Sequence, residues 1–310
     1  MSDHVSGFLK INNFYTMPGK ISDTNVAQRS LSIKIADIII RVDSSSDFKE
    51  FNDFGFYQNF LTKENLSPHC RLDHHIGLPP EFRMANDPFT TQNWQLSNID
   101  GQNVLRLGPP PKRGLPDNVV VFNADYSHGQ MYQNKVFELF RRFIDQFIII
   151  NLLSRNNGFL LHASGVIWEG KGLCFVGPSG AGKSTLLNLF GKELSRESLL
   201  NDDRVALRRA EKSWRVFGTP WYGESRVSSS GAAPLSALFF IRHAKNNYVR
   251  PLSAGEVCEQ LMVQSLVPVW DAEATARVLG IFQDLILNIP AFELGFLPDK
   301  SAIELIKKTI

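Results

Sequence analysis

The segment 177–185, Gly-Pro-Ser-Gly-Ala-Gly-Lys-Ser-Thr, constrains the fold of this chain more than any other part of the sequence. It satisfies the pattern G-x-x-x-x-G-K-[ST] and lies between an apolar run at 173–176 and a second apolar run from Leu186 to Phe190. A buried strand, a glycine-rich turn and a helix in this order are typical of α/β proteins. The sequence therefore predicts an α/β fold with a phosphate-binding loop in its second half.

The residue types of this loop match the chemistry of a nucleotide and its metal. The glycines let backbone N–H groups turn toward phosphate oxygens, the Lys183 ammonium reaches the terminal phosphates, and the Ser184 hydroxyl is placed to coordinate Mg²⁺. The helix that follows directs its positive end at the phosphates. The residues expected to bind the phosphates of the nucleotide are Gly177, Ser179, Gly180, Ala181, Gly182, Lys183, Ser184 and Thr185.

A phosphate loop does not name a reaction, because ATPases, GTPases and kinases share it. The apolar strand expected at 235–241 ends in Arg242-His243 and so supplies no acid for the metal, and the chain has no LSGGQ-like or NKxD-like segment. The best acids are Asp202 and Asp203, which lie 19 and 20 residues beyond Lys183. Neighbouring side chains on an extended segment point to opposite sides, so one carboxylate can serve Mg²⁺ and the other can accept a proton.

The order of these motifs resembles the HPr kinase/phosphorylase family and, more distantly, the ATP-type phosphoenolpyruvate carboxykinases. That family has a histidine on the strand before the loop, then G-x-S-G-x-G-K-S, an Asp-Asp pair and Glu-x-Arg. This chain has His162, the loop at 177–184, Asn201-Asp202-Asp203 and Glu224-Ser225-Arg226, so that the resemblance covers about residues 158 to 226.

The resemblance implies a P-loop serine kinase that uses ATP and Mg²⁺. Lys183 would hold phosphates, Ser184 and Glu224 would hold the metal, and the aspartate pair would provide the base and a further metal contact, with the two jobs not divided between them. His162 would lie beside the transferred phosphate or the base, and Arg226 would pair with phosphate oxygens. The predicted catalytic residues are thus Asp202, Asp203, His162 and Lys183, and the predicted metal ligands are Ser184, Asp202, Asp203 and Glu224.

The chain also departs from the family. The longer segment around Glu-x-Arg that is tied to the phosphorolytic reaction is absent, which argues against phosphorylase activity. The first half does not look like the family's usual N-terminal domain, so a sugar-transport phosphocarrier is not assumed as the acceptor. Relatives of this type include kinases that phosphorylate serine on ribosomally made peptides, such as lasso peptides. A non-catalytic ATP-binding regulator and a small-molecule hydroxyl kinase remain alternatives.

The change in sequence pattern near residue 130 predicts two domains, a β-rich domain at 1–128 and a second domain at 129–310. The resemblance implies that the second is an HPr kinase-like P-loop domain, and the first would then recognise the acceptor. In the first, residues 31–42 predict one bulged edge strand, and Asp100-Gly101 predicts a hairpin turn. In the second, the spacing of apolar residues predicts a long amphipathic helix over 131–154, and two strands are expected to form a hairpin before the loop. Ser253-x-x-Glu256 and Ser301-x-x-Glu304 predict capping boxes.

The net charge, the cysteines and the apolar segments of the chain restrict the partners and the location that the sequence predicts. A net charge of +2, with no run of Lys or Arg longer than two residues, gives no reason to expect nucleic acid. The three cysteines are far apart, and His69, Cys70 and His74-His75 match no metal-site spacing, so they predict an ordinary loop. No segment resembles a signal peptide or a membrane span, so a cytoplasmic protein without a membrane partner is expected. The expected partner is a peptide or protein acceptor, and a homo-oligomer is left open.

Overall fold

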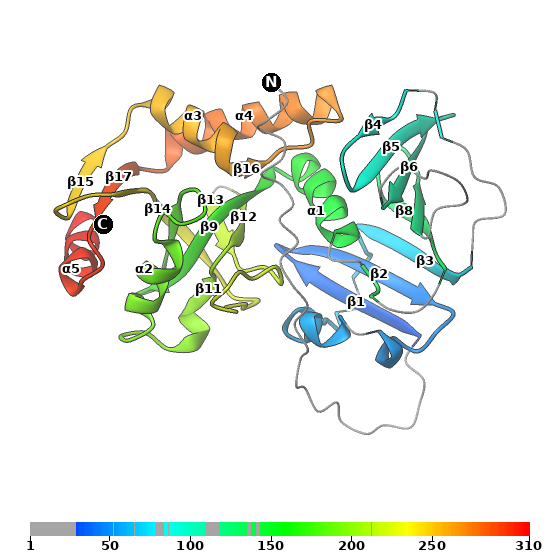
Figure 1. Ribbon diagram of the computed structural model, residues 1–310, viewed down its shortest axis with the longest axis horizontal. Coiled ribbons are helices and arrows are strands. Elements are labelled where there is room, and N and C mark those ends of the chain that lie inside the picture. The colour runs from blue at the N-terminus through cyan, green and yellow to red at the C-terminus, as the bar shows by residue number, and fades with distance from the viewer. Residues whose placement is uncertain are drawn as a thin grey trace.

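The computed structural model describes residues 29–51, 53–64, 66–77, 84–85, 87–108, 118–134, 138–140, 143–211 and 213–310. Over this part of the chain the protein is a mixed α/β protein with two mixed β-sheets, one in each half (Figure 1). Its α-helices are α1 (Ile144–Arg155), α2 (Lys183–Phe190), α3 (Ala254–Gln264), α4 (Ala272–Asn288) and α5 (Lys300–Thr309).

The first sheet has the strand order β1-β2-β3-β8-β7-β6-β5-β4 in the described residues. Two short 3₁₀ helices, η2 (Phe48–Glu50) and η3 (Phe54–Phe60), follow its first two strands. The predicted hairpin at Asp100-Gly101 is present, with φ of 51° and 78° at its two turn residues. The strands are β1 (Ser30–Ile35), β2 (Ile38–Ser44), β3 (Cys70–Ile76), β4 (Phe89–Thr90), β5 (Trp94–Ile99), β6 (Gln102–Leu107), β7 (Asn118–Phe122) and β8 (His128–Gln133).

The bulged strand predicted over 31–42 is wrong. This segment is a hairpin of β1 and β2, which pair antiparallel with Ile35 opposite Ile38. Ala36 and Asp37 both have positive φ, 51° and 59°, as a two-residue turn that matches strand twist requires. The change of phase in the apolar pattern therefore marks a reversal of the chain.

The long helix predicted over 131–154 is also wrong in its first part. Residues up to Gln133 belong to β8, where Gly129, Met131 and Gln133 are buried on one face of the first sheet. The helix α1 begins at Ile144 and is buried on nearly all sides, so it is a core helix and not an amphipathic one. Residues 135–137 and 141–142 lie outside the described residues.

The predicted loop at the His/Cys cluster is the central strand β3. Its alternation places Cys70, Leu72 and His74 on the core side. His74 is buried between the Ser44 hydroxyl, 2.8 Å from Nδ1, and the Gln133 side-chain oxygen, 3.1 Å from Nε2. Both ring nitrogens of His74 therefore have a hydrogen-bond partner, as expected for a histidine in the core.

The second sheet has the order β10-β9-β12-β13-β14-β17-β15 in the described residues, with β11 and β16 paired to β9 and a further pairing of β10 with β14. This last pairing closes a ring of five strands, since β9, β12, β13, β14 and β10 each pair with the next. The strands are β9 (Gly158–Trp168), β10 (Lys171–Val176), β11 (Leu199–Asn201), β12 (Arg204–Ala210), β13 (Ser213–Phe217), β14 (Ala232–His243), β15 (Tyr248–Pro251), β16 (Ser265–Leu266) and β17 (Ala291–Phe296), with a 3₁₀ turn η4 (Arg196–Ser198).

Helices cover both faces of the parallel strands β10, β14 and β17. Side chains alternate between the faces: Phe175 and Phe239 pack with α2 and α5, whereas Cys174 and Phe240 pack with α3 and α4. Figure 1 shows α3 and α4 along one edge of this half and α2 with α5 on the other side. The helices packed on both faces hold β10 in place, and the glycine-rich loop starts at the C-terminal end of this strand.

The N-termini of α3 and α5 are capped in two different ways. The capping box at Ser253 is present, but the one predicted at Ser301 is wrong, because α5 begins after Asp299, whose side chain accepts from the Ser301 N–H.

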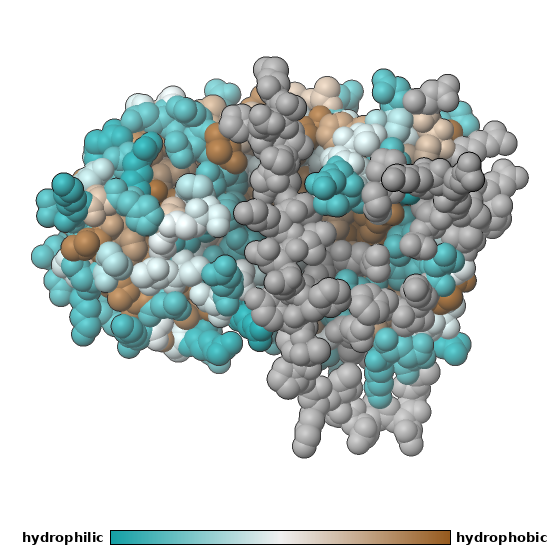
Figure 2. All heavy atoms as spheres, in the orientation of Figure 1, coloured by the Kyte–Doolittle hydropathy of each residue, from teal (hydrophilic) through white to brown (hydrophobic). Residues whose placement is uncertain are grey.

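None of the helices in the described residues combines the length and hydropathy needed to cross a lipid bilayer. In the face shown in Figure 2, hydrophilic residues dominate the outer surface around α2, α3 and α5.

The helix α1 joins the two halves. It contacts β2 of the first sheet and β9 and α4 of the second half. One continuous core includes Ile38 and Phe122 of the first sheet together with Leu160, Phe217 and Trp221 of the second half. The Arg208 guanidinium adds a hydrogen bond of 3.0 Å to the Ala36 carbonyl. The two sheets are therefore packed against each other through a shared apolar core.

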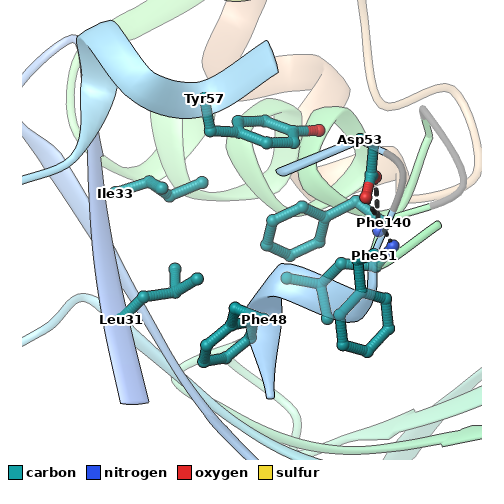
Figure 3. Close-up of a pocket in the computed structure, with 8 residues that line it drawn as sticks. Leu31, Ile33, Phe48, Phe51, Asp53, Tyr57 and Phe140 are labelled. Carbon is teal, nitrogen blue, oxygen red and sulfur yellow. Dashed lines mark hydrogen bonds between the residues drawn. The ribbon is translucent and has the colours of Figure 1, made fainter. Parts of the chain in front are cut away.

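A buried carboxylate, Asp53, lies in the apolar part of the first half. Figure 3 shows it among apolar side chains that include Phe48, Phe51 and Phe140, and its oxygens accept from the N–H groups of Leu139 at 2.8 Å and Phe140 at 3.2 Å. Burial raises the pKa of Asp53 to about 7, although these two hydrogen bonds oppose the shift. The folded state thus binds this proton more tightly than the unfolded state does.

The raised pKa makes stability depend on pH. The contribution of Asp53 is fully present below its unfolded pKa of about 4 and is lost as the pH rises through about 7. We expect the free energy of unfolding to fall between about pH 5 and about pH 8, and the fall to be smaller in Asp53→Asn. Urea unfolding at both pH values measures this. If the free energy of unfolding falls equally with pH in the unchanged protein and in Asp53→Asn, the prediction is contradicted.

Candidate active site

The glycine-rich loop has the predicted order of strand, turn and helix, with β10 before it and α2 after it. Gly180 and Gly182 have φ of 82° and 103°, in the left-handed region that residues with a side chain adopt only at a cost. A Cβ at Gly180 would meet no atom within 4 Å, so the chain passes through open space there. The loop therefore contains two positive-φ positions that favour glycine, as a tight phosphate-binding turn does.

Lys183 is buried at the start of α2 and its side chain lies across the loop. Its ammonium donates to the Gly177 carbonyl at 2.7 Å and to the Pro178 carbonyl at 2.9 Å. Burial lowers the pKa of Lys183 to about 8, while the charges of Asp203 and Asp202 raise it. The ammonium is thus charged at neutral pH and lies within electrostatic reach of both aspartates.

The other loop residues are more open. Ser179 and Thr185 are exposed, Ser184 is half-buried and Ala181 is buried. The Gly180 carbonyl lies 2.8 Å from Nε2 of His243, at the end of β14. His243 thus holds one peptide group of the loop from the neighbouring strand, at the place where the sequence offers no acid.

The two aspartates have different surroundings. Asp202 is buried, and its carboxylate accepts from the N–H groups of Gly223 at 2.8 Å, Ser225 at 2.7 Å and Val227 at 3.3 Å. Burial raises the pKa of Asp202, and these hydrogen bonds oppose the rise. Both of its oxygens are therefore engaged by backbone.

Asp203 has a 24% exposed side chain and interacts with charged or titratable partners. Its Oδ1 lies 3.0 Å from Nε2 of His162, and its Oδ2 lies 3.1 Å from Nη1 of Arg204. Burial raises the pKa of Asp203, but the His162 hydrogen bond and the charges of Arg204 and Lys183 outweigh it and lower the pKa to about 2. Asp203 is therefore an ionised carboxylate at neutral pH.

The strand register brings His162 to this point. His162 lies on β9 directly opposite Arg204 on β12, so the histidine and the aspartate pair meet although they are 41 residues apart. Two residues further along β9, the Ser164 hydroxyl lies 3.4 Å from the Lys183 carbonyl. The strand β9 thus connects the aspartate pair to the start of the loop helix.

Glu224 and Arg226 lie in a turn and not on an extended segment, where their two-residue spacing would place both side chains on one face. They are exposed residues of a turn in which the Arg226 N–H donates to the Gly223 carbonyl at 3.3 Å, and Arg226 has a φ of 53°. The turn forms because one buried carboxylate, Asp202, collects three N–H groups of this short segment. It places Glu224 and Arg226 next to the aspartate pair in space.

The predicted magnesium ligands do not form a preformed cage. In the part of the chain that the structure describes, no group of three or more His, Cys, Asp and Glu side chains is arranged to hold a metal ion. Asp202 faces backbone N–H groups, and Asp203 and Ser184 remain as partly open oxygen donors. Mg²⁺ bound with a nucleotide needs only one or two protein carboxylates, because substrate phosphates and waters complete its shell. The donor set present therefore fits a nucleotide-bound Mg²⁺.

No protein-family model matches this sequence, and no curated protein matches it. The chain is similar to a solved structure, the Hpr(Ser) kinase/phosphatase from Coxiella burnetii, with 12% sequence identity and a TM-score of 0.29. The similarity covers 48% of this chain and 86% of that chain. It is a distant similarity.

Sequence reasoning missed residues that build the site. Asn201 is fully buried, and its side-chain oxygen accepts from the N–H groups of Asp203 at 2.7 Å and Arg204 at 2.8 Å, which bends the chain at the aspartate pair. Its amide donates to the Thr219 carbonyl at 2.8 Å. The asparagine directly before two acids was the available signal, since such residues commonly form turns with their own backbone.

Proposed function

We propose that this chain is an ATP- and Mg²⁺-dependent kinase, with an HPr kinase-like P-loop domain, that transfers the γ-phosphoryl group to a serine or other hydroxyl of a peptide or protein. The observation that carries the proposal is that Asp203, 3.0 Å from His162, lies within electrostatic reach of the buried Lys183 ammonium of the glycine-rich loop. A purely structural loop has no need of a buried ammonium and an open carboxylate at the same place.

The loop residues supply the binding of the triphosphate. The N–H groups between Gly177 and Ser184 would face the phosphates, and Lys183 would exchange its carbonyl partners for phosphate oxygens. The Ser184 hydroxyl would hold Mg²⁺ together with the exposed carboxylate of Glu224 in the turn, because both oxygens of Asp202 are engaged by backbone N–H groups. The metal, when bound, neutralises charge on the phosphates. Arg226 would add a further positive charge to the phosphate oxygens.

Asp203 is the better candidate for the base. Its carboxylate is ionised and partly open, whereas Asp202 is buried and engaged by three N–H groups. The acceptor hydroxyl would donate to Asp203 while its oxygen bonds to the γ-phosphorus and the bond to the ADP oxygen breaks; the proton passes to the carboxylate. A weak base suffices, because phosphoryl transfer depends mainly on positioning and charge stabilisation. His162 fixes the orientation of Asp203.

The acceptor would be a peptide or protein that the first half helps to recognise, and phosphorolysis is not part of the proposal. Incubation of the full chain with γ-labelled ATP, Mg²⁺ and candidate peptides, followed by mass spectrometry, tests it. A gain of one phosphate on a peptide hydroxyl supports the proposal. ATP binding without transfer to any acceptor would favour a non-catalytic regulator, and labelling of small alcohols alone would favour a small-molecule kinase.

A further inference from the structure

The segment from Thr219 to Val227, which we call the Glu-x-Arg loop, is held by buried side chains from two directions. Asn201 at the end of β11 binds the first residue through the Thr219 carbonyl, and Asp202, between β11 and β12, binds the N–H groups of Gly223, Ser225 and Val227. Between these two attachments, the Trp221 indole N–H donates to Oδ2 of Asp145 at 2.7 Å.

Asp145 lies in the first turn of α1 and is fully buried, with 0% of its surface exposed. Its Oδ2 also accepts from the Tyr57 hydroxyl at 2.7 Å, and its Oδ1 accepts from the Gln146 N–H at 2.8 Å. One carboxylate oxygen therefore receives a donor from the first half of the chain and a donor from the Glu-x-Arg loop.

The contact between the first half and the loop extends beyond this oxygen. Tyr57 belongs to η3, and the preceding residue, Phe56, lies with its ring centroid 5.0 Å from that of Tyr222 in the loop. Trp221 is itself 2% exposed and belongs to the core shared by the two halves. The 3₁₀ helix η3 therefore packs against the same two loop residues, Trp221 and Tyr222, that precede Gly223.

We propose that Asp145 is a positioning residue for phosphoryl transfer: by binding Tyr57 and Trp221 through one oxygen, it makes the first half of the chain set the position of the Glu-x-Arg loop at the active site. This inference rests on the proposed kinase function. The physical link is short, because Trp221 is two residues before Gly223, whose N–H binds Asp202 next to Asp203. A displacement of about 1 Å at such a site costs about a hundredfold in rate.

The decisive variant is Trp221→Phe, which keeps a ring and removes only the indole donor. The matched control is Trp214→Phe: Trp214 is 4% exposed and its indole N–H donates to Asp284 at 2.9 Å, but it lies on β13 away from the loop. We expect Trp221→Phe to lower kcat at least about tenfold with the Kd for ATP within about twofold, and Trp214→Phe to keep the kcat of the unchanged protein.

A second measurement does not require catalysis. Hydrogen exchange of the Gly223, Ser225 and Val227 amides should become at least about tenfold faster in Trp221→Phe and stay unchanged in Trp214→Phe. Equal exchange in both variants, or equal kcat, would overturn the inference. If Trp221→Phe does not fold, Tyr57→Phe removes the other donor to Asp145 and carries the same expectations. If the unchanged protein transfers no phosphate, the kinase proposal fails, whereas the exchange data still report whether Asp145 holds the loop.

Discussion

Replacement of Lys183 by alanine is expected to abolish phosphoryl transfer while the fold is retained. The ammonium is the one buried positive charge within the loop, and burial together with the two aspartates keeps its pKa at about 8, so that it is charged when a triphosphate arrives. Its loss leaves the terminal phosphates without the charge that the loop directs at them, and removal of such a group costs about 10³-fold or more in rate. Transfer of labelled phosphate to the acceptor measures the effect.

Lys192→Ala is the matched control for Lys183→Ala. Lys192 follows the same helix, two residues beyond Phe190, and its side chain is exposed, so that this variant removes one lysine charge without touching the loop. We expect unchanged turnover in Lys192→Ala and near-native thermal unfolding in both variants. Normal phosphorylation by Lys183→Ala would exclude the proposed chemistry.

Features encoded by neighbouring residues could be predicted from the sequence. The glycine-rich loop, the turn at Asp100-Gly101 and the capping box at Ser253 each depend on a few adjacent side chains and their own backbone. The turn at Ala36 and Asp37 has the same geometry without a glycine, so that its residues gave no signal and the hairpin was predicted as one strand.

Features that depend on packing could not be predicted. The pattern at 131–154 contains residues of a strand and of a buried helix, and burial on both sides removes the periodicity that separates the two. The unequal surroundings of Asp202 and Asp203 arise because a loop more than 15 residues later folds over only one of them. The buried Asp145 is one of several polar residues in a mostly apolar helix sequence, and nothing local shows that Tyr57 and Trp221 meet there.

Asp203→Asn is expected to reduce phosphoryl transfer by about 10²-fold or more while ATP binding remains, which is the scale of the loss of a general base. The amide keeps the shape of the side chain and an oxygen that can accept from His162, but it cannot take the proton of the acceptor hydroxyl. The side chain is only 24% exposed and its pKa is lowered to about 2 in the folded state, so that loss of its charge should lower the free energy of unfolding at neutral pH by about 1–3 kcal/mol.

Asp202→Asn is the informative comparison, because its expected effect is on structure first. The asparagine amide can accept through one oxygen only, so at least one of the N–H groups of Gly223, Ser225 and Val227 loses its acceptor inside the protein, which costs about 1–3 kcal/mol. We therefore expect lower stability, faster amide exchange in the Glu-x-Arg loop and an indirect loss of rate. Denaturant unfolding and turnover, measured for both variants, separate the two roles. If Asp203→Asn retains the wild-type rate and Asp202→Asn loses rate without losing stability, then Asp202 is the base. The assignment made from their hydrogen bonds would then be reversed.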